Sequence, residues 1–320
     1  MKFKPLGGSG INVSSIIMGT WQAGKTMWTG IDDHETLKAL REAYDAGITT
    51  FDTATVYGDG HSERMVGKAL KDIREHVVIA TKVFANQLHH DGVMASCEQS
   101  LKDLGTDRID LYQIHWPAGS FGSRIVPLED TMNALNTLKE QGKIRSIGVS
   151  NFSREQLEDA SQYGQIDSLQ PPYSLFWRHI ETEILPYCNE NGITILAYSP
   201  MAQGFLTGKF GPDHRFDKGD HRAKSRLFKP ENYQRVQDAL TRLKPIADRN
   251  GLNLAQLALA WVTSHEAACA IAGARNAAQV RENVVAGDTV LPQPDLDEMD
   301  RIGRNVTDPM NMNNAVMWEF

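Results

Sequence analysis

Short apolar runs rich in β-branched residues alternate with longer amphipathic stretches along most of this chain. Such runs are typical of buried strands, whereas apolar residues at helical spacing, such as Leu37, Leu40 and Ala43, indicate a helix. The pattern predicts strands at residues 15–18, 49–51, 77–81, 109–114, 146–149, 166–170, 194–197 and 268–271. Strands that alternate with helices form βαβ units, so the predicted fold class is α/β with a parallel sheet.

The amphipathic stretches between these strands predict the helices. Their bounds are residues 33–46, 62–71, 93–104, 128–142, 184–191, 233–250, 253–265 and 296–303, with further helices near Leu157 and after Arg275. Ser62 has the side chain of an N-cap for the second of these helices, and Gly47 ends the first as a C′ residue.

The N-terminal segment predicts a hairpin. Residues 2–6 and 11–14 are short strand-like runs joined by the Gly-rich sequence GGSG. Its glycines do not complete a GxGxxG motif, and no helix opens after them, so a turn is favoured over a phosphate-binding loop.

Three consecutive predicted strands end in a reactive side chain: Asp52, Lys82 and His115, with Tyr57 in the loop after Asp52. The C-terminal ends of parallel barrel strands are where active sites lie. An ammonium beside the Tyr57 phenol would lower its pKa from about 10, and Asp52 would hold that ammonium in place. Singly, each residue is more typical of a turn, a solvated surface or structural packing. Their repetition in successive β–α units favours catalysis.

Two further polar groups follow predicted strands. Ser150, Asn151 and Gln170 carry hydroxyl and amide groups that can bind a carboxamide, although Asn151 can also cap the next helix. After the strand at residues 194–197, a glycine-containing loop lets the backbone approach a pyrophosphate closely. The residues of this loop predicted to bind a cofactor are Tyr198, Ser199, Pro200, Met201, Ala202, Gly204, Leu206 and Lys209.

The last predicted strand leads into a helix that begins near Arg275. Arg275, Gln279, Glu282 and Asn283 lie on one face at helical spacing. A guanidinium beside a helix N-terminus suits a phosphate; Gln279 can support that group, and Glu282 and Asn283 can bond the edge of adenine. The alternative is an amphipathic surface helix. Arg275 favours NADPH over NADH.

Several long stretches of the chain resemble, in order, the signatures of the aldo-keto reductase family. They are FDTATVYGDGHSERMVGKAL, IATK, LYQIHW, SIGVSNF, AYSPMAQGFLTGK and AIAGARNAAQVRENV, and the similarity runs from about residue 6 to residue 285. The resemblance implies a (β/α)8 TIM barrel with an N-terminal β-hairpin that plugs the barrel bottom, as a single domain over residues 1–320. It implies NADPH as cofactor and Asp52, Tyr57, Lys82 and His115 as the catalytic residues.

The resemblance also assigns parts of the cofactor. The nicotinamide carboxamide would lie on Ser150, Asn151 and Gln170, with Tyr173 beneath the ring. Further cofactor contacts are expected from Gly19, Thr20, Trp21, Asp52 and Gly273, besides the loop and helix residues named above.

Aromatic residues next to these positions predict the substrate pocket. Trp21, Phe84 and Trp116 would line it together with Tyr57 and His115. The loop at residues 116–127 is longer than the roughly 2–6 residues usual for such connections, which indicates substrate contact. Aromatic walls suit an apolar or aromatic aldehyde, while polar loops leave small sugars and trioses open as substrates. The basic segment at residues 210–230 predicts a mobile flap over the cofactor.

Composition narrows the class of function. The chain has 320 residues, 41% of them hydrophobic, with a net charge of −7, so nucleic acid is not expected as a partner. No apolar run reaches the roughly 20 residues of a membrane helix. Cys97, Cys188 and Cys269 form no disulfide or zinc spacing and are expected to be buried in a protein of the reducing cytoplasm. His89 and His90 lack further ligands, so no metal is expected. The tail at residues 306–320 is compatible with a lid or a homo-oligomer contact.

The sequence therefore predicts an NADPH-dependent carbonyl reductase, in which Tyr57 is the general acid for hydride transfer to a small-molecule aldehyde, ketone or sugar. The alternative is a reductase-like, redox-sensing subunit that binds a membrane channel.

Overall fold

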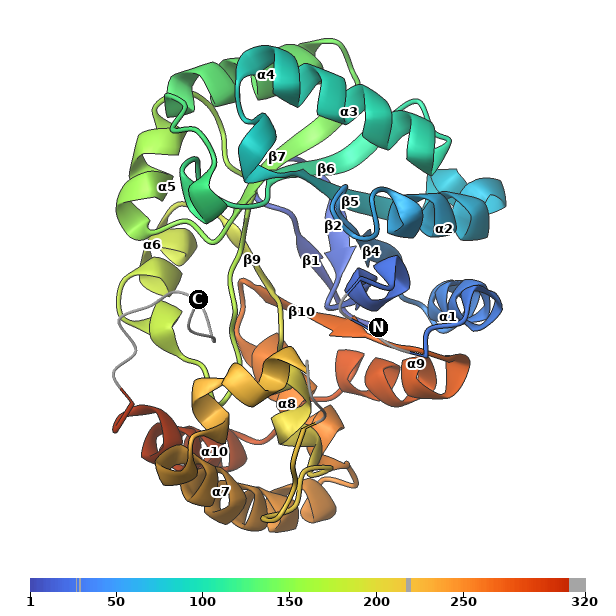
Figure 1. Ribbon diagram of the computed structural model, residues 1–320. Coiled ribbons are helices and arrows are strands. Elements are labelled where there is room, and N and C mark those ends of the chain that lie inside the picture. Colours follow the sequence, from blue (N-terminus) through green and yellow to red (C-terminus); the bar gives the residue numbers. More distant parts are fainter. Residues whose placement is uncertain (27, 29, 217–219, 311–320) are drawn as a thin grey trace.

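The computed structural model describes residues 1–26, 28, 30–216 and 220–310. Its parallel strands close into a barrel in the order β10-β3-β4-β5-β6-β7-β8-β9 (Figure 1). The bounds are β3 (Ile16–Gly19), β4 (Thr50–Asp52), β5 (Val78–Val83), β6 (Ile109–Ile114), β7 (Ile144–Ser150), β8 (Ser168–Gln170), β9 (Thr194–Ala197) and β10 (Ala268–Gly273). Each predicted barrel strand overlaps one of these, and the predicted (β/α)8 barrel is confirmed.

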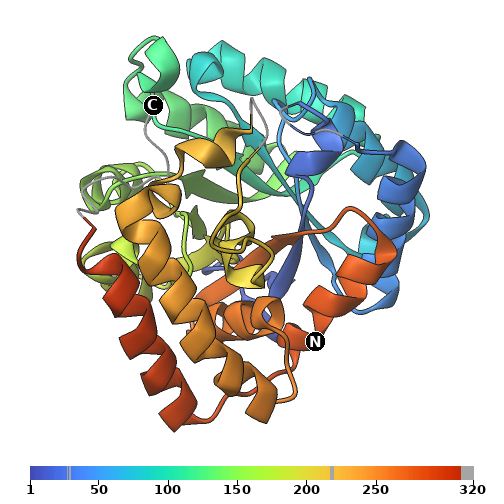
Figure 2. The same cartoon turned by 60° about the horizontal axis from the view of Figure 1, so that its bottom comes forward.

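Helices surround the barrel and follow its strands in sequence (Figure 2). They are α1 (Asp33–Asp45), α2 (His61–Leu70), α3 (His90–Leu104), α4 (Leu128–Glu140), α5 (Arg154–Ser161), α6 (Ile184–Glu190), α7 (Pro230–Arg249), α8 (Leu254–Ser264), α9 (Ala277–Val284) and α10 (Gln293–Thr307). Short 3-10 turns are η1 (Trp21–Gly24), η2 (Lys71–His76), η3 (Ala85–Gln87), η4 (Ser120–Gly122), η5 (His179–Glu181), η6 (Ala202–Thr207), η7 (His221–Lys224), η8 (Arg226–Phe228) and η9 (Val285–Gly287). The helix α7 begins earlier than predicted, because a proline needs no hydrogen-bond acceptor in the first turn.

The prediction that Ser62 caps α2 is wrong. The N-cap is Gly60, whose φ of 77° is left-handed, and Ser62 lies inside the helix. The buried Ser62 hydroxyl donates to the Thr20 carbonyl at 3.0 Å and accepts from the Thr53 hydroxyl at 2.9 Å. It therefore joins the ends of β3 and β4 instead of capping a helix. Gly47, with a φ of 95° after α1, is the predicted C′ residue.

The predicted N-terminal hairpin is present as the antiparallel pair β1 (Phe3–Pro5) and β2 (Asn12–Ser14). It contacts the first residues of barrel strands. The Thr194 hydroxyl of β9 donates to the Pro5 carbonyl at 2.8 Å, and the Lys4 ammonium donates to the Ala268 carbonyl of β10 at 2.7 Å. Because all barrel strands are parallel, these contacts place the hairpin across the N-terminal end of the barrel.

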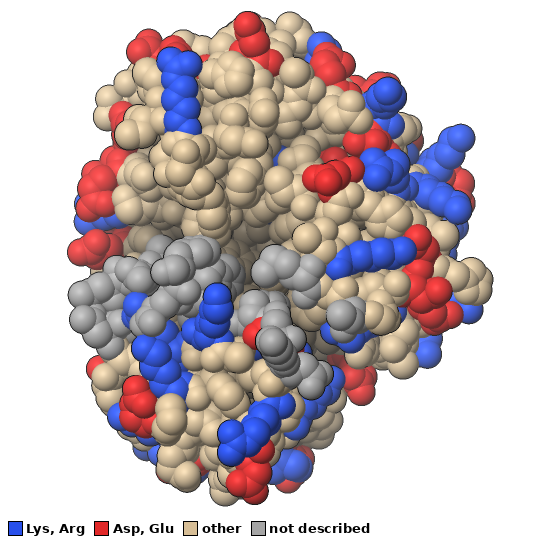
Figure 3. All heavy atoms as spheres, viewed as in Figure 1, with Lys and Arg blue, Asp and Glu red and all other residues tan. Residues whose placement is uncertain are grey.

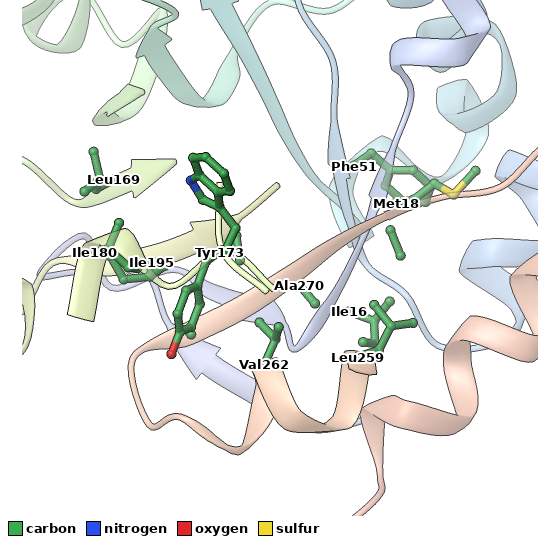
Figure 4. Packing of buried hydrophobic residues seen from close by; sticks show 14 of the residues in the cluster. Ile16, Met18, Phe51, Leu169, Tyr173, Ile180, Ile195, Leu259, Val262 and Ala270 are labelled. Carbon is green, nitrogen blue, oxygen red and sulfur yellow. The ribbon is translucent and has the colours of Figure 1, made fainter. Parts of the chain in front are cut away.

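Two apolar layers follow from the alternation of side chains along each strand. Inward residues Ile17, Ala80, Leu111, Leu196 and Ile271 pack with hairpin residues inside the barrel. Their neighbours in sequence pack outward, against helices; these include Ile16, Ile79, Tyr112, Ile195 and Ala270, some of which are shown in Figure 4.

The next inward positions after Ala80 and Leu111 are Lys82 and Gln113. The barrel interior is thus apolar near the hairpin and polar at the C-terminal ends of the strands. Figure 3 shows a hollow near the centre of one face, lined mainly by uncharged residues, with Lys and Arg side chains gathered below it.

The three cysteines, Cys97, Cys188 and Cys269, are buried as predicted, and burial raises the pKa of each thiol to about 12. Within the described residues, no helix has the length and apolar character needed to cross a membrane.

Candidate active site

A buried ion pair lies at the C-terminal end of the barrel interior. The fully buried Lys82 ammonium donates to Asp52 Oδ1 at 2.6 Å and to the Thr53 carbonyl at 2.7 Å. The other carboxylate oxygen, Asp52 Oδ2, accepts from Gln170 at 2.8 Å and from Gln113 at 3.4 Å. Burial lowers the pKa of Lys82, and the charge of Asp52 opposes that shift. The sequence correctly placed Asp52 beside Lys82.

Gln113 was missed by the sequence analysis. It is fully buried and bonds both Asp52 and Gln170, whose amide donates to Gln113 Oε1 at 3.3 Å. The alternation along β6 could have indicated it, since Gln113 lies two residues before His115 and faces the same side.

Tyr57 lies over this ion pair. The Lys82 ammonium is 5.2 Å from the centroid of the Tyr57 ring, and the ring of His115 is 5.8 Å away, edge to face. Burial raises the pKa of Tyr57 well above its ordinary value, and the negative charge of Asp52 adds to that shift. The expected downward shift of the Tyr57 pKa is wrong, because burial of the phenol, and not the nearby ammonium, sets its direction. The phenol is neutral at neutral pH and able to donate its proton.

Two glycines fix the backbone of Tyr57. A Cβ on Gly24, in η1, would lie 2.5 Å from the carbonyl carbon of Tyr57. Gly58 has a φ of 67°, and a Cβ there would lie 2.2 Å from the carbonyl oxygen of Gly24. Only residues without a side chain permit this close contact, which locks the Tyr57 loop against η1.

His115 follows β6 and is neutral at neutral pH, because burial and the Lys82 charge lower its pKa well below the ordinary value. Its Nδ1 is buried and has no hydrogen-bond partner among the described residues. The His115 carbonyl accepts from the Asn151 amide at 3.0 Å, which ties the ends of β6 and β7 together.

An aromatic wall extends outward from His115. Phe84 lies edge-on to His115 at 5.7 Å and stacks on Phe121 at 5.5 Å, while Trp116 meets Phe121 at 5.1 Å. Phe84, Trp116, Tyr57 and His115 are thus brought together as predicted for a pocket. Phe121, which is 55% exposed and has a left-handed φ of 55°, was not predicted. In the sequence, only the length of the loop at residues 116–127 indicated a substrate contact in the region of Phe121.

The group after β7 and β8 is bonded internally. The Ser150 hydroxyl donates to the Gln170 carbonyl at 2.7 Å and accepts from the Asn151 amide at 3.0 Å. Asn151 Oδ1 accepts from the Tyr198 hydroxyl at 2.9 Å. The alternative in which Asn151 caps the next helix is wrong, because the N-cap of α5 is Ser153. To bind a carboxamide, this group would have to replace one of these internal hydrogen bonds with a hydrogen bond to the carboxamide.

The expectation that Tyr173 lies beneath a nicotinamide ring is wrong. Tyr173 is fully buried, and its hydroxyl donates to Glu181 at 2.9 Å and lies 3.0 Å from His265 Nε2. His265 precedes β10, so the hydroxyl points toward the N-terminal ends of the strands; Figure 4 shows its oxygen on that side. The tyrosine near Tyr57 is Tyr198, which packs against the inner apolar layer.

The loop after β9 has an unusual backbone. Ser199, Ala202, Gln203 and Gly204 have positive φ values of 52°, 49°, 56° and 99°. Gln203 Nε2 is buried and has no hydrogen-bond partner among the described residues. Pro200, Ala202 and Leu206 are buried, whereas Ser199 and Met201 are partly exposed and Lys209 is exposed.

The segment after β10 is held by its own helix. The Arg275 amide donates to Gln279 Oε1 at 2.8 Å, and the Asn283 amide donates to the Gly273 carbonyl at 3.3 Å. Asn283 is buried and Glu282 exposed, so they do not form one open face as predicted.

The turn after β3 lies beside this segment. Gly19 pairs with Gly273 across the two strands. The Thr20 hydroxyl is buried and donates to the Asp52 carbonyl at 2.8 Å. Its proton is therefore used in a hydrogen bond at the end of β4. Trp21 packs edge-on against Trp28 at 5.3 Å.

The predicted flap falls partly outside the described residues, which omit residues 217–219. Its described aromatic residues, Phe210, Phe216 and Phe228, pack with Phe205 and Tyr233. The flap stays a prediction. The predicted role of the C-terminal tail lies largely outside the described residues, which end at Met310.

The sequence matches known proteins over nearly its whole length. The model of the Aldo/keto reductase family matches residues 15–304. An aldo-keto reductase of Bacillus subtilis is 36% identical, covering 97% of this chain and 96% of that protein. An NADH-specific methylglyoxal reductase of Escherichia coli is 37% identical over 92% of this chain and 96% of its own length. A probable voltage-gated potassium channel subunit beta of Arabidopsis thaliana is 34% identical over 91% and 92%.

Solved structures agree with this result. A glycerol dehydrogenase from Gluconobacter oxydans matches with a TM-score of 0.88 and 32% identity, over 97% of each chain. An aldo-keto reductase from Klebsiella pneumoniae in complex with NADPH matches with a TM-score of 0.77 and 29% identity, over 100% of each chain. The fold and site define a barrel oxidoreductase. The chain belongs to the aldo/keto reductase family.

Proposed function

We propose that this protein is an NADP(H)-dependent carbonyl reductase in which Tyr57 is the general acid. The observation that carries the proposal is the convergence of a neutral phenol, a neutral imidazole and the buried Asp52–Lys82 pair at one end of the barrel. The ion pair measures 2.6 Å, and Lys82 lies 5.2 Å from the Tyr57 ring centroid. Burying two charges beside a phenol costs desolvation free energy, and groups perturbed in this way cluster at functional sites.

The residues around this site fit a nicotinamide dinucleotide. Three successive left-handed residues, Ala202, Gln203 and Gly204, turn the loop after β9 sharply. The backbone amides of Ala202 and Gly204 donate to the Ser199 and Met201 carbonyls, whereas the buried Gln203 side-chain amide is unpartnered among the described residues and offers a donor to a phosphate. Arg275 follows β10 and suits a second phosphate. Tyr198 after β9, Asn151 after β7 and Gln170 at the end of β8 would hold the nicotinamide. When bound, this cofactor supplies the hydride.

Each catalytic residue then has a definite task. The substrate carbonyl oxygen accepts hydrogen bonds from the Tyr57 hydroxyl and from His115. The Tyr57 proton passes to that oxygen as negative charge develops on it, and Lys82 stabilises the phenolate that remains. The high pKa of Tyr57 keeps the proton in place until a strongly basic oxygen forms. Asp52 keeps Lys82 charged and fixed, and Gln113 and Gln170 keep Asp52 fixed.

Replacement of Tyr57 by phenylalanine tests the proposal. We expect Tyr57→Phe to lower kcat by about 10²- to 10⁴-fold, the usual contribution of a general acid. NADPH binding measured by calorimetry should stay within about twofold, because the ring and its packing remain. A variant with a near-normal kcat would contradict the role of Tyr57.

A second candidate function is a redox-sensing subunit of a membrane channel. It is favoured by one observation, the similarity to a probable voltage-gated potassium channel subunit beta, and an intact catalytic group does not distinguish the two functions. Turnover of 4-nitrobenzaldehyde or methylglyoxal, followed by NADPH absorbance, separates them: an enzyme turns over many times, whereas a sensor oxidises its bound cofactor about once.

The aromatic wall favours an apolar or aromatic aldehyde over a sugar. Phe84, Trp116 and Phe121 offer apolar faces beside His115. A panel of aromatic aldehydes, trioses and sugars, each with NADPH and with NADH, tests this preference. Higher kcat/KM for a triose than for 4-nitrobenzaldehyde would contradict it.

A further inference from the structure

The guanidinium of Arg275 lies on the face of an aromatic ring that the sequence analysis did not connect with it. The Arg275 guanidinium carbon is 5.3 Å from the ring centroid of Trp28. Trp28 belongs to the connection between β3 and α1, far from Arg275 in sequence. No carboxylate within ion-pair distance of Arg275 occurs in the described part of the chain, although Arg281 on the same segment pairs with Glu42 at 2.9 Å.

Trp28 is itself held in place. Its ring packs edge-on against Trp21 at 5.3 Å, and its amide donates to the Lys25 carbonyl at 3.0 Å. Close by, the Gln22 amide donates to the Ala274 carbonyl at 2.9 Å. The β3–α1 connection thus contacts the segment after β10 at two adjacent residues, Ala274 and Arg275.

The contact with Trp28 leaves the hydrogen-bonding capacity of the guanidinium intact. The ring attracts the guanidinium charge through its π-face and accepts no conventional hydrogen bond, so the N–H donors stay available for a bidentate contact with a phosphate. An Arg275 side chain held against the ring also has fewer conformations to lose when an anion binds, so part of the cost of binding is removed in advance.

We propose that Trp28 is a specificity-determining residue, which orients Arg275 for the 2′-phosphate that distinguishes NADP(H) from NAD(H). The inference rests on the proposed function and deepens it, because it names a residue that sets the choice of cofactor. It also bears on how relatives with similar barrels come to prefer NADH, as the Escherichia coli methylglyoxal reductase does by its name.

Calorimetric titration with two adenosine nucleotides isolates this contact. Adenosine 2′,5′-bisphosphate and adenosine 5′-monophosphate differ only in the 2′-phosphate and need no substrate or turnover. We expect Trp28→Ala to bind the bisphosphate about 2- to 5-fold more weakly, the range of an exposed cation–π contact, and to bind the monophosphate as the unaltered protein does. Trp28→Phe keeps an aromatic face and should retain most of the affinity.

Two further variants complete the design. Arg275→Ala should lose most of the preference for the bisphosphate, and adding Trp28→Ala to it should cost nothing more, since the two residues act through one contact. Arg281→Ala, in the helix α9 that follows Arg275 and paired with Glu42, should leave both affinities unchanged.

The outcomes separate the inference from the proposed function. Equal weakening of both nucleotides by Trp28→Ala, no weakening, or tighter binding of the bisphosphate would each overturn the role of Trp28. If the unaltered protein binds neither nucleotide, the proposed function fails, and the inference fails with it. If it binds both equally well, the NADP(H) preference and the role of Trp28 are overturned, while carbonyl reduction with NADH stands.

Discussion

The two ends of the barrel each hold a lysine, Lys4 partly buried and Lys82 fully buried, and use it differently. At the N-terminal end, the Lys4 ammonium donates to the carbonyls of Thr263, His265 and Ala268 at 2.8, 2.6 and 2.7 Å. At the C-terminal end, Lys82 faces the Asp52 carboxylate and one carbonyl. Burial lowers the pKa of both lysines.

The difference lies in what surrounds each charge. Lys4 is saturated by backbone oxygens that have no chemistry at neutral pH, so it fastens the hairpin to β10 and does nothing more. Lys82 lies against the Tyr57 phenol, and the Asp52 carboxylate that it bonds also accepts from the amides of Gln113 and Gln170. A change of charge on Tyr57 therefore changes the electrostatic energy of Lys82. The comparison predicts that stability depends on both ends of the barrel, and catalysis on one.

The largest expected effect is at Lys82. Lys82→Met leaves the buried Asp52 charge unpaired, and we expect the free energy of unfolding to fall by about 3–5 kcal/mol and kcat to fall at least about 100-fold. Chemical denaturation and steady-state kinetics measure the two. Adding Asp52→Asn should restore most of the stability and none of the activity. Recovery of activity in the double variant would contradict the role given to Lys82.

Lys4→Met is expected to act on stability alone. It removes three charge-assisted hydrogen bonds to carbonyls, and we expect a loss of about 2 kcal/mol in the free energy of unfolding. The kcat of the folded variant should be unchanged, because the hairpin lies at the opposite end from Tyr57. Lys2→Met is the matched control, since Lys2 is exposed and makes one such bond at 3.0 Å. A lowered kcat in Lys4→Met would show that the two ends are coupled.

Gly24→Ala probes the catalytic end without touching a charge. The added Cβ would lie 2.5 Å from the carbonyl carbon of Tyr57 and must displace that loop. We expect kcat to fall about tenfold from misplacement of the phenol, with a smaller change in KM for NADPH. Gly211→Ala, in open space, is the control. Equal kcat in both variants would mean that the glycine contact does not position Tyr57.

The smallest expected effect is a pH dependence of stability at His115. Its folded pKa is depressed, so as pH falls below about 6.5 the unfolded chain takes up a proton before the folded protein does. Stability therefore falls with acidification in this range, by about 1 kcal/mol per pH unit from this residue. Unfolding of His115→Gln between about pH 7.5 and 5 should show a shallower decline. Parallel curves would contradict a neutral His115 with a depressed pKa.

The sequence determined the parts of this protein that depend on local periodicity. Runs of apolar residues predicted each barrel strand, because a strand buried on both faces needs apolar side chains on both. The positions just after those strands predicted that Asp52, Lys82 and His115 meet, because parallel strands bring their C-terminal ends to one rim. The family signatures supported the same residues.

The tertiary structure decided which partner each polar group takes. The Ser62 hydroxyl could cap its own helix or bond Thr20 and Thr53, and only the packing of α2 against the strand ends favours the second. Tyr173 turns toward His265, 92 residues away in sequence. Hydrogen-bond partners so distant leave no periodic signal in the chain.

The pKa of Tyr57 and the surroundings of Arg275 also depend on the tertiary structure. The sequence put an ammonium near the Tyr57 phenol and so predicted a lowered pKa, but the extent of burial, which only the closed barrel sets, reverses the direction. It also singled out Arg275 and could not show the ring of Trp28 against it. Local pattern fixes which face a side chain takes, whereas burial and long-range contact fix what that side chain can do.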